Sequence, residues 1–555
     1  LKNGTVQATG VSANGGVVAV DGGGCELHLE DVTMSVADDK GGATSDGGVL
    51  YAFSPADQPA IITVKGNSVI NGSAAGTRRF GGAVALAGGS QMYLLGGTVQ
   101  NGKAGCGGNF YLSETARLYI AGGTVAGGEA VDNSQVAGEG GNIALCAQAQ
   151  VHQFSGMVTG GTATKNGGNL FVLCYGESGT SGYYQYGGAV ETGAADCGGN
   201  IYAMETPSLV RLDGGEVRQG KARQGGNLYL QDAVLEMRGA VLTGLQEDDT
   251  AMNGGNIYSK AGKIYLYDGQ ITKGWSKDSG ANIYGIDTTL MMYGGSITYG
   301  SSDASGTTAG GGNVFLNGAS VFDIYAGEIA NGECNRSGTA NNSSAGNVMI
   351  MDTTRMQMFG GVIRDGILKG NPCRCGNIMI SGMNKGDNTY FHMYGGTLEN
   401  EALPASTSRG HILGAYSNTA STDGQGVARI FDGDINYKGD KNGGAAQFTL
   451  WARRGYEENP WNVYVFQTKY KGLYQHANTS CEDGSHNNKV EDVAATCTTP
   501  GCTKYHCNSC GDWYKVTAPA AGHTETATAV AATALLPGYT EHSCSACSAK
   551  WITAE

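Results

Sequence analysis

The chain has 555 residues, of which 94 are glycine and 9 are proline, and charged residues make up 15%. The formal net charge of −14 argues against nucleic acid as a partner, because phosphate binding needs clustered lysine and arginine. The sequence has no apolar run of about 18 residues, so it predicts no membrane span. Abundant glycine with little proline and 40% apolar residues excludes collagen and disordered linkers, and it favours tight turns between short strands.

A short element, usually Gly-Gly-Asn followed by apolar residues, recurs along most of the chain at spacings of 26 to 34 residues. Val17, Val49 and Ala83 fill the same position before the first asparagine, and His411 and Ala445 fill it after the last one. Self-similarity at a regular period is typical of a solenoid. The repeated asparagines are Asn109, Asn142, Asn169, Asn200, Asn227, Asn256, Asn282, Asn313, Asn347 and Asn377.

Each period contains three strand-like pieces and nothing with helical periodicity. In residues 263–267, Ile264 and Leu266 fall on one face of a strand, and Tyr265 and Tyr267 fall on the other. The pattern predicts an all-β parallel β-helix, a β-solenoid of about 14–15 coils, over residues 1–450. Each coil has three short strands, and each strand pairs with its equivalents in the neighbouring coils.

The asparagines are expected to form a ladder at one corner of the coil. Each side-chain amide can donate to the next asparagine, and Asn and Gly both tolerate the left-handed backbone that a sharp corner requires. On these residues the chain resembles right-handed parallel β-helix proteins over about residues 1–450. That resemblance implies the architecture but no single activity, because the fold carries lyases, hydrolases, adhesins, phage spikes and passive stalks.

Acidic residues that could divide the acid and base roles of a polysaccharide-cleaving enzyme are scattered along the chain. We interpret Glu247–Asp249 as a solvated loop tip, and Asp432 and Asp434 as turn residues. His392 and His411 occupy repeat positions, where a ladder or surface role is expected. The sequence therefore predicts that the solenoid is not an enzyme.

One column of the second strand carries an aromatic residue in six consecutive coils. We favour a stack that stabilises one edge of the solenoid, because aromatic neighbours in register attract one another. The alternative is a flat strip that binds sugar rings or a neighbouring subunit. The six residues are Tyr267, Tyr293, Tyr325, Phe359, Tyr394 and Phe431.

Fifteen cysteines are typical of an exported chain. Cys146 and Cys174 lie four and five residues after their corner asparagines in adjacent coils, which makes them a candidate disulfide. Cys334 and Cys373 lie in equivalent loops of adjacent coils and form a second candidate pair.

The repeat fades near residue 450. Residues 451–490, with Trp451 and Trp461, are predicted to cap or link the solenoid, because its open end is an unpaired strand edge. Residues 491–555 hold two copies of a Cys-rich module, since "ATCTTPGCTKYHCNSC" (495–510) aligns with "ATALLPGYTEHSCSAC" (532–547). These copies resemble the CxxC modules of secreted surface proteins of Gram-positive bacteria, which implies an extracellular location on the bacterial cell surface.

The two CxxC pairs permit two chemistries. Cys507, Cys510, Cys544 and Cys547 could bind one Zn²⁺, the only cofactor that the sequence suggests. Outside the cell we favour disulfides, with Cys481, Cys497 and Cys502 as further partners. The second copy has Ala534 in the position of Cys497, which leaves its chemistry in doubt.

The sequence as a whole predicts an extracellular structural protein: a stalk, an adhesin or the subunit of a self-assembling fibre. The rival prediction is a β-helix protein that binds or cleaves carbohydrates, with host or environmental glycans as partners. Leu1 to Val6 resemble the third strand of a coil, so the first coil is expected to be incomplete. We expect residues 450–555 of a neighbouring copy, including Trp451 and Trp461, to cover it and join subunits head to tail.

Overall fold

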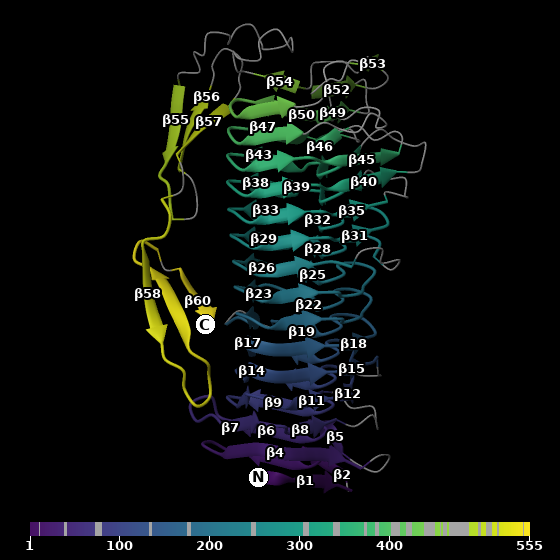
Figure 1. Ribbon diagram of the computed structural model, residues 1–555, viewed down its shortest axis with the longest axis vertical. Coiled ribbons are helices and arrows are strands. Elements are labelled where there is room, and N and C mark those ends of the chain that lie inside the picture. The colour runs from purple at the N-terminus through teal and green to yellow at the C-terminus, as the bar shows by residue number, and fades with distance from the viewer. Residues whose placement is uncertain are drawn as a thin grey trace.

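The computed structural model describes most of the chain, and every element in the described part is a β-strand. The described residues are 1–9, 11–37, 42–72, 80–132, 136–174, 179–245, 251–303, 310–336, 344–370, 375–382, 388–400, 411–417, 425–437, 450–454, 457–458, 463–465, 488–497, 501–506, 513–518, 521–547 and 549–554. They form a tall stack of parallel coils, here called the rod (described residues 1–465), and a C-terminal arm (described residues 488–554) that runs back along its flank (Figure 1). No described helix is long and apolar enough to cross a membrane.

The first face of the rod consists of the strands that follow the corner asparagine or its equivalent, and each pairs in parallel with the next. These strands are β3 (Val18–Asp21), β6 (Leu50–Ser54), β9 (Val84–Gly88), β13 (Phe110–Leu112), β16 (Ile143–Leu145), β19 (Leu170–Leu173), β22 (Ile201–Met204), β25 (Leu228–Gln231), β28 (Ile257–Lys260), β32 (Ile283–Ile286), β37 (Val314–Asn317), β42 (Val348–Met351), β46 (Cys375–Gly382), β49 (His411–Ser417) and β52 (Leu450–Arg454).

The second face carries the alternating strands of the repeat. These are β7 (Ile61–Lys65), β10 (Gln91–Leu94), β20 (Gly182–Gln185), β23 (Leu209–Leu212), β26 (Val234–Met237), β29 (Lys263–Leu266), β33 (Thr289–Met292), β38 (Val321–Ile324), β43 (Arg355–Met358), β47 (Asn388–Met393), β50 (Gln425–Ile430) and β54 (Val463–Val465). Since β52 and β54 still pair with the coil before them, parallel stacking extends past residue 450.

The third face follows a glycine turn. Its strands are β8 (Val69–Asn71), β11 (Thr98–Gln100), β21 (Ala189–Glu191), β24 (Glu216–Arg218), β27 (Val241–Thr243), β30 (Gln270–Thr272), β34 (Ser296–Thr298), β39 (Glu328–Ala330), β44 (Val362–Arg364), β48 (Thr397–Asn400) and β51 (Asp434–Tyr437). In three coils one long strand spans the second and third faces: β4 (Glu26–Val36), β14 (Arg117–Ala126) and β17 (Gln150–Thr159). The first strand, β1 (Lys2–Ala8), pairs with residues 30–36 of β4 and so lies mainly on the third face. The predicted coil of three short strands is thus confirmed, although the second turn is shallow enough in these coils for the strand to continue.

Short strands precede the asparagine corner in several coils and add a narrow fourth ladder that the sequence did not predict. They are β2 (Val11–Asn14) with β5 (Gly42–Asp46), then β12 (Lys103–Ala104), β15 (Glu129–Ala130) and β18 (Thr162–Ala163), and then β31 (Trp275–Ser276), β35 (Ser301–Ser302), β40 (Glu333–Arg336) and β45 (Ile367–Gly370). The remaining rod strands are β36 (Gly310–Gly311), β41 (Ser344–Ala345) and β53 (Glu457–Glu458).

One continuous hydrophobic core fills the rod from Val20 to Ile430. Within β29, Ile264 and Leu266 point into it and are fully buried, while Tyr265 lies on the outer surface, as the alternation predicts. Each coil exposes its apolar edge to the next, so a coil buries its core only by stacking. Stability therefore depends on keeping neighbouring coils in register.

The arm consists of two three-stranded antiparallel sheets of the same topology. The first contains β55 (Asn488–Val493), β56 (Gly501–His506) and β57 (Trp513–Ala518), and the second contains β58 (Glu525–Val530), β59 (Tyr539–Cys544) and β60 (Lys550–Ala554). The sequence repeat of the tail is thus a structural repeat. In Figure 1 the arm descends beside the second-face strands, and the C-terminus lies to the left of β17.

The residues proposed for assembly are only partly described. Leu1 is exposed, and its amino group donates a hydrogen bond to the His28 carbonyl oxygen at 2.8 Å. Val6 packs against the core, and β1 pairs with β4 alone among the described strands. The side chain of Trp451 and the whole of Trp461 lie outside the described residues. Head-to-tail joining therefore remains a prediction.

Candidate functional site

The predicted asparagine ladder is confirmed. All ten side chains are fully buried, and each Nδ2 donates to the Oδ1 of the asparagine in the next coil, from Asn109 to Asn377. The donor–acceptor distances lie between 2.6 Å, for Asn227 to Asn256, and 2.9 Å, for Asn347 to Asn377. The ladder is a continuous hydrogen-bonded chain through the corner of the rod.

Each ladder asparagine also satisfies the backbone around it. Asn227 Nδ2 donates to the Thr243 carbonyl oxygen at 2.9 Å, and its Oδ1 accepts from the Gly220 amide at 3.0 Å. Gly225 holds the corner at φ +67°, and a Cβ on Gly226 would stand 2.2 Å from the Gly255 carbonyl oxygen. Glycine is required here because the corner turns into the left-handed region and the stacked backbones leave no space.

The six predicted aromatic residues form one stacked column. Successive ring centroids from Tyr267 to Phe431 lie 5.0 to 5.3 Å apart, and adjacent planes differ by at most 11°. Burial raises the pKa of Tyr293 to about 12, so its hydroxyl stays protonated at neutral pH. The predicted rings therefore stack in register, whereas their role as a stabilising edge or as a binding strip stays a prediction. Tyr267 and Tyr293 of this column line a cleft beside the arm.

A second aromatic column was missed. It runs along the first face, at the position two residues after the ladder asparagine, with centroids between 4.7 and 5.8 Å apart. The regular offset from the asparagine was a signal in the sequence that could have found it. Its members are Phe171, Tyr202, Tyr229, Tyr258, Tyr284 and Phe315.

The second face carries a shorter third column toward the N-terminus, formed by Tyr93, Tyr119, His152 and Tyr184. His152 stacks between Tyr119 and Tyr184, and its Nδ1 lies 3.1 Å from the Tyr186 hydroxyl. Burial, with a smaller contribution from Arg117, lowers the pKa of His152 to about 4. This histidine is therefore a neutral member of a stack at pH 7.

The structure does not form the predicted Cys146–Cys174 bridge. Both are thiols: Cys146 shares a hydrogen bond with Cys106, and Cys174 Sγ lies 3.5 Å from the Gly179 carbonyl oxygen. The two cysteines differ by one residue in their offset from the corner, and one step along a strand turns a side chain to the other face. Of the second pair, Cys334 is buried and Cys373 lies outside the described residues.

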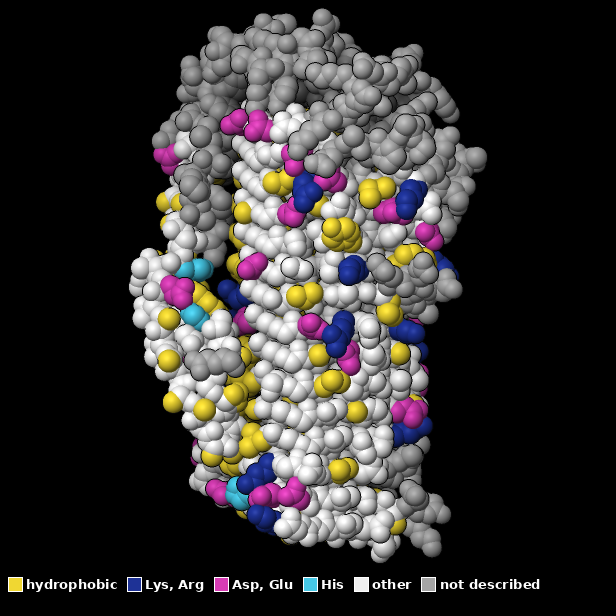
Figure 2. Space-filling view, viewed as in Figure 1, with side chains coloured by type: hydrophobic (Ala, Val, Ile, Leu, Met, Phe, Trp, Pro, Cys, Tyr) yellow, Lys and Arg dark blue, Asp and Glu magenta, His cyan; other side chains and the backbone are white. Residues whose placement is uncertain are grey.

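The arm contacts the rod beside the second face, along a line here called the seam. Arg211 donates to the Lys550 carbonyl oxygen at 2.9 Å, and the rings of Phe154 and Tyr539 lie 6.0 Å apart. Figure 2 shows hydrophobic side chains gathered between the arm and the rod. The seam joins residues more than 300 positions apart, since Arg211 and Lys550 are separated by 339.

A charged network lies at the centre of the seam. Arg211 Nε lies 2.9 Å from Asp213 Oδ1, Arg238 Nε lies 3.8 Å from the same oxygen, and Arg238 Nη2 lies 3.2 Å from Glu236 Oε2. The Arg238 guanidinium also covers the ring of Tyr267 at 4.3 Å. Burial raises the pKa of Asp213, although the hydrogen bond from Arg211 opposes this shift. The carboxylates are paired with arginines.

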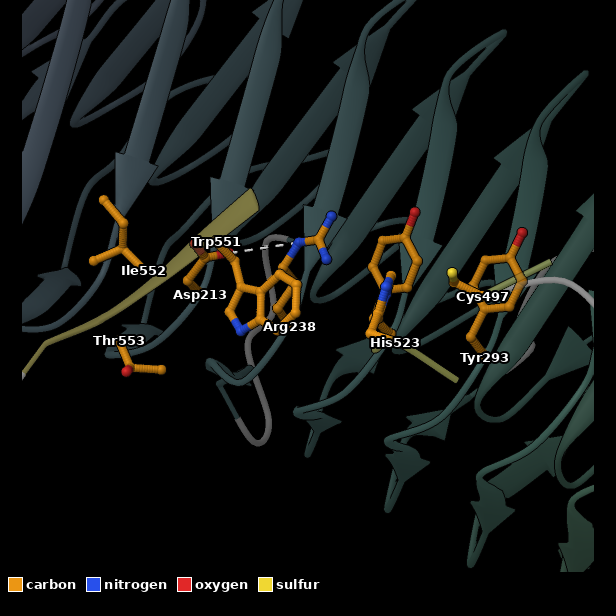
Figure 3. A pocket seen from close by; sticks show the side chains of 9 residues that line it. Asp213, Arg238, Tyr293, Cys497, His523, Trp551, Ile552 and Thr553 are labelled. Carbon is orange, nitrogen blue, oxygen red and sulfur yellow. Dashed lines mark ion pairs between the residues drawn. The ribbon is translucent and has the colours of Figure 1, made fainter. Parts of the chain in front are cut away.

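A cleft of about 350 Å³ opens in the seam between this network and the arm (Figure 3). Trp551 and His523 from the arm enter it from one side, and Arg238, Tyr267 and Tyr293 from the rod line the other. A second cleft of about 320 Å³ adjoins it and is lined by residues that include Tyr184, Tyr186 and His542.

Four metal-ligating side chains converge in the arm at the edge of the first cleft. The ligand atoms of Cys497, His523, Cys544 and Cys547 all lie within 4.8 Å of one another. Cys497 Sγ is 3.5 Å from Cys544 Sγ, and Cys547 Sγ is 3.5 Å from His523 Nδ1. This group is called the Cys–His cluster below.

The thiols of the cluster share protons. Burial alone would raise the pKa of Cys544, but hydrogen bonds from His523, the Ala546 amide and the other two thiols lower it to about 6. The hydrogen bond to Cys544 raises the pKa of Cys497 to about 11, and burial adds to this effect. At neutral pH the cluster therefore favours a thiolate at Cys544.

The cluster contains only half of the predicted metal ligands. Cys544 and Cys547 are present, whereas Cys507 and Cys510 lie outside the described residues. Cys497 was predicted as a disulfide partner, and His523 was not predicted at all. The second repeat has Ala534 where the first repeat has Cys497. Cys497 of the first repeat completes the cluster in its place.

The comparisons with known proteins give no family. No protein-family model, curated protein or solved structure matches the chain. The chain is therefore described by its own geometry: a parallel β-solenoid with an asparagine ladder and a C-terminal Cys–His cluster.

Proposed function

We propose that this chain is a passive structural protein of the bacterial cell surface, acting as a stalk, an adhesin shaft or a fibre subunit. The observation that carries the proposal is the unbroken ladder from Asn109 to Asn377, in which every buried amide is used to bind the next coil. The stacked column from Tyr267 to Phe431 adds a second continuous tie along the rod. Amides and rings that bind the next coil stiffen the rod, and these repeat positions are then not available for catalysis.

The seam carboxylates favour structure over catalysis. A glycosidase needs one carboxyl group as an acid and another as a base or nucleophile, both facing the substrate. Here Asp213 is paired with Arg211, and Glu236 is paired with Arg238. Neither carboxylate is available to attack a bound sugar without breaking an ion pair.

The extracellular location is part of the proposal and rests on two features of the sequence. The chain has 15 cysteines, a number typical of exported proteins. The tandem modules of the arm also resemble CxxC modules of secreted surface proteins of Gram-positive bacteria. Head-to-tail joining through β1 is included because, among the described strands, β1 pairs with β4 on one edge only, and the other edge could accept a strand of a second copy.

A glycan-binding role is the second candidate, and the first seam cleft favours it. Tyr267, Tyr293 and Trp551 present aromatic rings to a space of about 350 Å³, next to the cation of Arg238. Rings beside a polar group suit the apolar face and the hydroxyls of a sugar. An adhesin could therefore combine the rod with this cleft.

Electron microscopy of the purified chain, together with an assay of reducing ends released from a polysaccharide panel, tests the proposal. We expect uniform rods or filaments and no released sugar, both for the wild type and for Asp213→Asn. A chain lacking residues 1–9 should keep the rod but lose any filaments. Release of reducing ends by the wild type and not by Asp213→Asn would overturn the structural role. Glycan binding without cleavage, abolished by Trp551→Ala, would support the adhesin form of the proposal.

A further inference from the structure

The Cys–His cluster contains the donor set of a structural zinc site. Three cysteine sulfurs and one histidine nitrogen are a common closed set for tetrahedral Zn²⁺, and a C-x2-C pair, here Cys544 and Cys547, is its usual sequence signature. Four protein ligands leave no position for water or substrate. A metal in this site would hold the chain together and would not catalyse a reaction.

The distances fit a shared metal better than a disulfide. With Zn–S near 2.3 Å and Zn–N near 2.0–2.1 Å, the edges of a tetrahedron are roughly 3.8 Å between sulfurs and roughly 3.5 Å between sulfur and nitrogen. Cys497 Sγ and Cys544 Sγ are 3.5 Å apart, and Cys547 Sγ and His523 Nδ1 are also 3.5 Å apart. A disulfide would need about 2.05 Å between two of the sulfurs and would leave His523 without a purpose in the cluster.

The second repeat of the arm also needs such a tie, because its described residues form almost no hydrophobic core. Among its residues 521–547 and 549–554, Cys544 is the only apolar side chain that is buried. Strands β58 and β59 consist mainly of exposed or half-buried residues. Sheets of this size rarely stay folded without a metal or disulfides, since they bury too little apolar surface.

The four ligands come from different parts of the arm. Cys497 follows β55 in the first repeat, His523 lies between the repeats, and Cys544 and Cys547 lie at and after the end of β59 in the second. A metal here would therefore fasten one repeat to the other. Because Cys497 and His523 also line the first seam cleft beside Tyr293, the same metal would set the position of the arm over the aromatic column.

We propose that Cys497, His523, Cys544 and Cys547 bind one Zn²⁺ that fastens the two repeats of the arm together and holds the arm against the rod. The inference is independent of the proposed function, because a zinc-fastened arm would serve a stalk, an adhesin or an enzyme equally well.

The test uses the full chain, purified without chelator, and its Cys497→Ser and Cys502→Ser variants. Cys502 lies on β56 of the same repeat as Cys497 but outside the cluster, so it is the matched control. Elemental analysis should find about one Zn²⁺ fewer per chain in Cys497→Ser than in the wild type, and no loss in Cys502→Ser. Co²⁺ exchanged into the wild type should give the absorption bands of tetrahedral thiolate coordination, and these should weaken in Cys497→Ser only.

Limited proteolysis reports on the folding of the arm and does not require the zinc content of the chain to be measured. A chelator should speed cleavage within residues 488–554 by about tenfold or more while the rod survives, because a structural metal contributes directly to folding. The same acceleration should appear in Cys497→Ser without chelator. Equal zinc content in the wild type and Cys497→Ser would overturn the proposal. So would a Cys497–Cys544 disulfide detected by mass spectrometry of the unreduced chain.

Discussion

The rod and the arm solve the same problem, holding short strands together, in different ways. In the rod, the same side chain recurs in ten successive coils, so Asn227 contacts Asn200 before it and Asn256 after it. In the second repeat of the arm, the described antiparallel strands bury almost nothing, and four unlike positions of the arm meet once, at the Cys–His cluster. A repetitive fold distributes its stability over many equivalent contacts, whereas a small module concentrates it in one.

This difference predicts how each part responds to damage. A solenoid loses stability locally, because each coil contacts only its neighbours, and the loss adds to the other nearest-neighbour terms. The arm has no such reserve, so the loss of one ligand of the cluster should release all of it. On the rod side of this comparison, the expected loss of stability decreases from the ladder to the aromatic column to a single buried histidine.

Replacing a ladder asparagine should have the largest effect. Asn227→Ala removes the acceptor for the Asn200 amide and the Gly220 amide, and the donor to the Thr243 carbonyl and to Asn256. Leaving buried polar groups unpaired should lower the free energy of unfolding by about 3 kcal/mol. Urea denaturation followed by circular dichroism measures this loss. The exposed Lys260→Ala is the control, and equal midpoints for the two variants would show that the ladder does not stabilise the rod.

Removing one ring from the aromatic column should have a smaller effect. Tyr325→Ala loses the stacks with Tyr293 at 5.1 Å and with Phe359 at 5.0 Å. Two aromatic pairs at about 0.5–1.5 kcal/mol each predict a loss of about 2 kcal/mol in the same denaturation experiment. Tyr325→Phe keeps both stacks and should stay within about 0.5 kcal/mol of the wild type. A large loss in Tyr325→Phe would mean that the hydroxyl, and not the stack, is what matters.

The smallest effect concerns His152 and pH. Its folded pKa is lowered, to about 4, so the folded rod favours the neutral ring. The stability that depends on the neutral ring is present above the unfolded pKa of about 6.5 and is lost as pH falls from about 6.5 towards 4. Since one pKa unit is worth about 1.4 kcal/mol, this loss should reach about 1 kcal/mol near pH 6.

His152→Phe keeps the ring between Tyr119 and Tyr184 but removes the titration. The difference between the melting temperatures of the variant and the wild type should therefore be constant near neutral pH and should change below about pH 6. Carboxylates that titrate in the same window affect both proteins equally, so the difference isolates His152. Parallel curves down to pH 4 would contradict the depressed pKa.

The sequence predicted the features that repeat, because stacking places residues that are one period apart in sequence next to each other in space. Asn227 and Asn256 are 29 residues apart in sequence and adjacent in the ladder, and the spacing alone was enough to align them. The column that contains Tyr229 and Tyr258 follows the same rule and could have been found by reading two residues past each asparagine.

The cluster could not be found in that way. Cys497, His523 and Cys544 come from the segment after β55, the linker before β58 and the end of β59, and no regular interval separates them. The contact between Arg211 and Lys550 is equally hidden, because it depends on where the arm lies along the rod. The Cys146–Cys174 bridge was predicted but is not formed, for a more local reason: a one-residue difference in offset from the corner turns the two side chains apart.

At the corner of the rod, the rise from one coil to the next does not depend on the length of the loops. Successive ladder asparagines are 26 to 34 residues apart in sequence, yet the hydrogen bond between them varies only from 2.6 to 2.9 Å. Extra residues are therefore accommodated sideways, in loops between the faces, while the coils keep a common rise of about 4.8 Å. A peptide grafted into such a loop would be displayed at a height fixed by its coil. The rod could therefore present several ligands at known distances from one another along its axis.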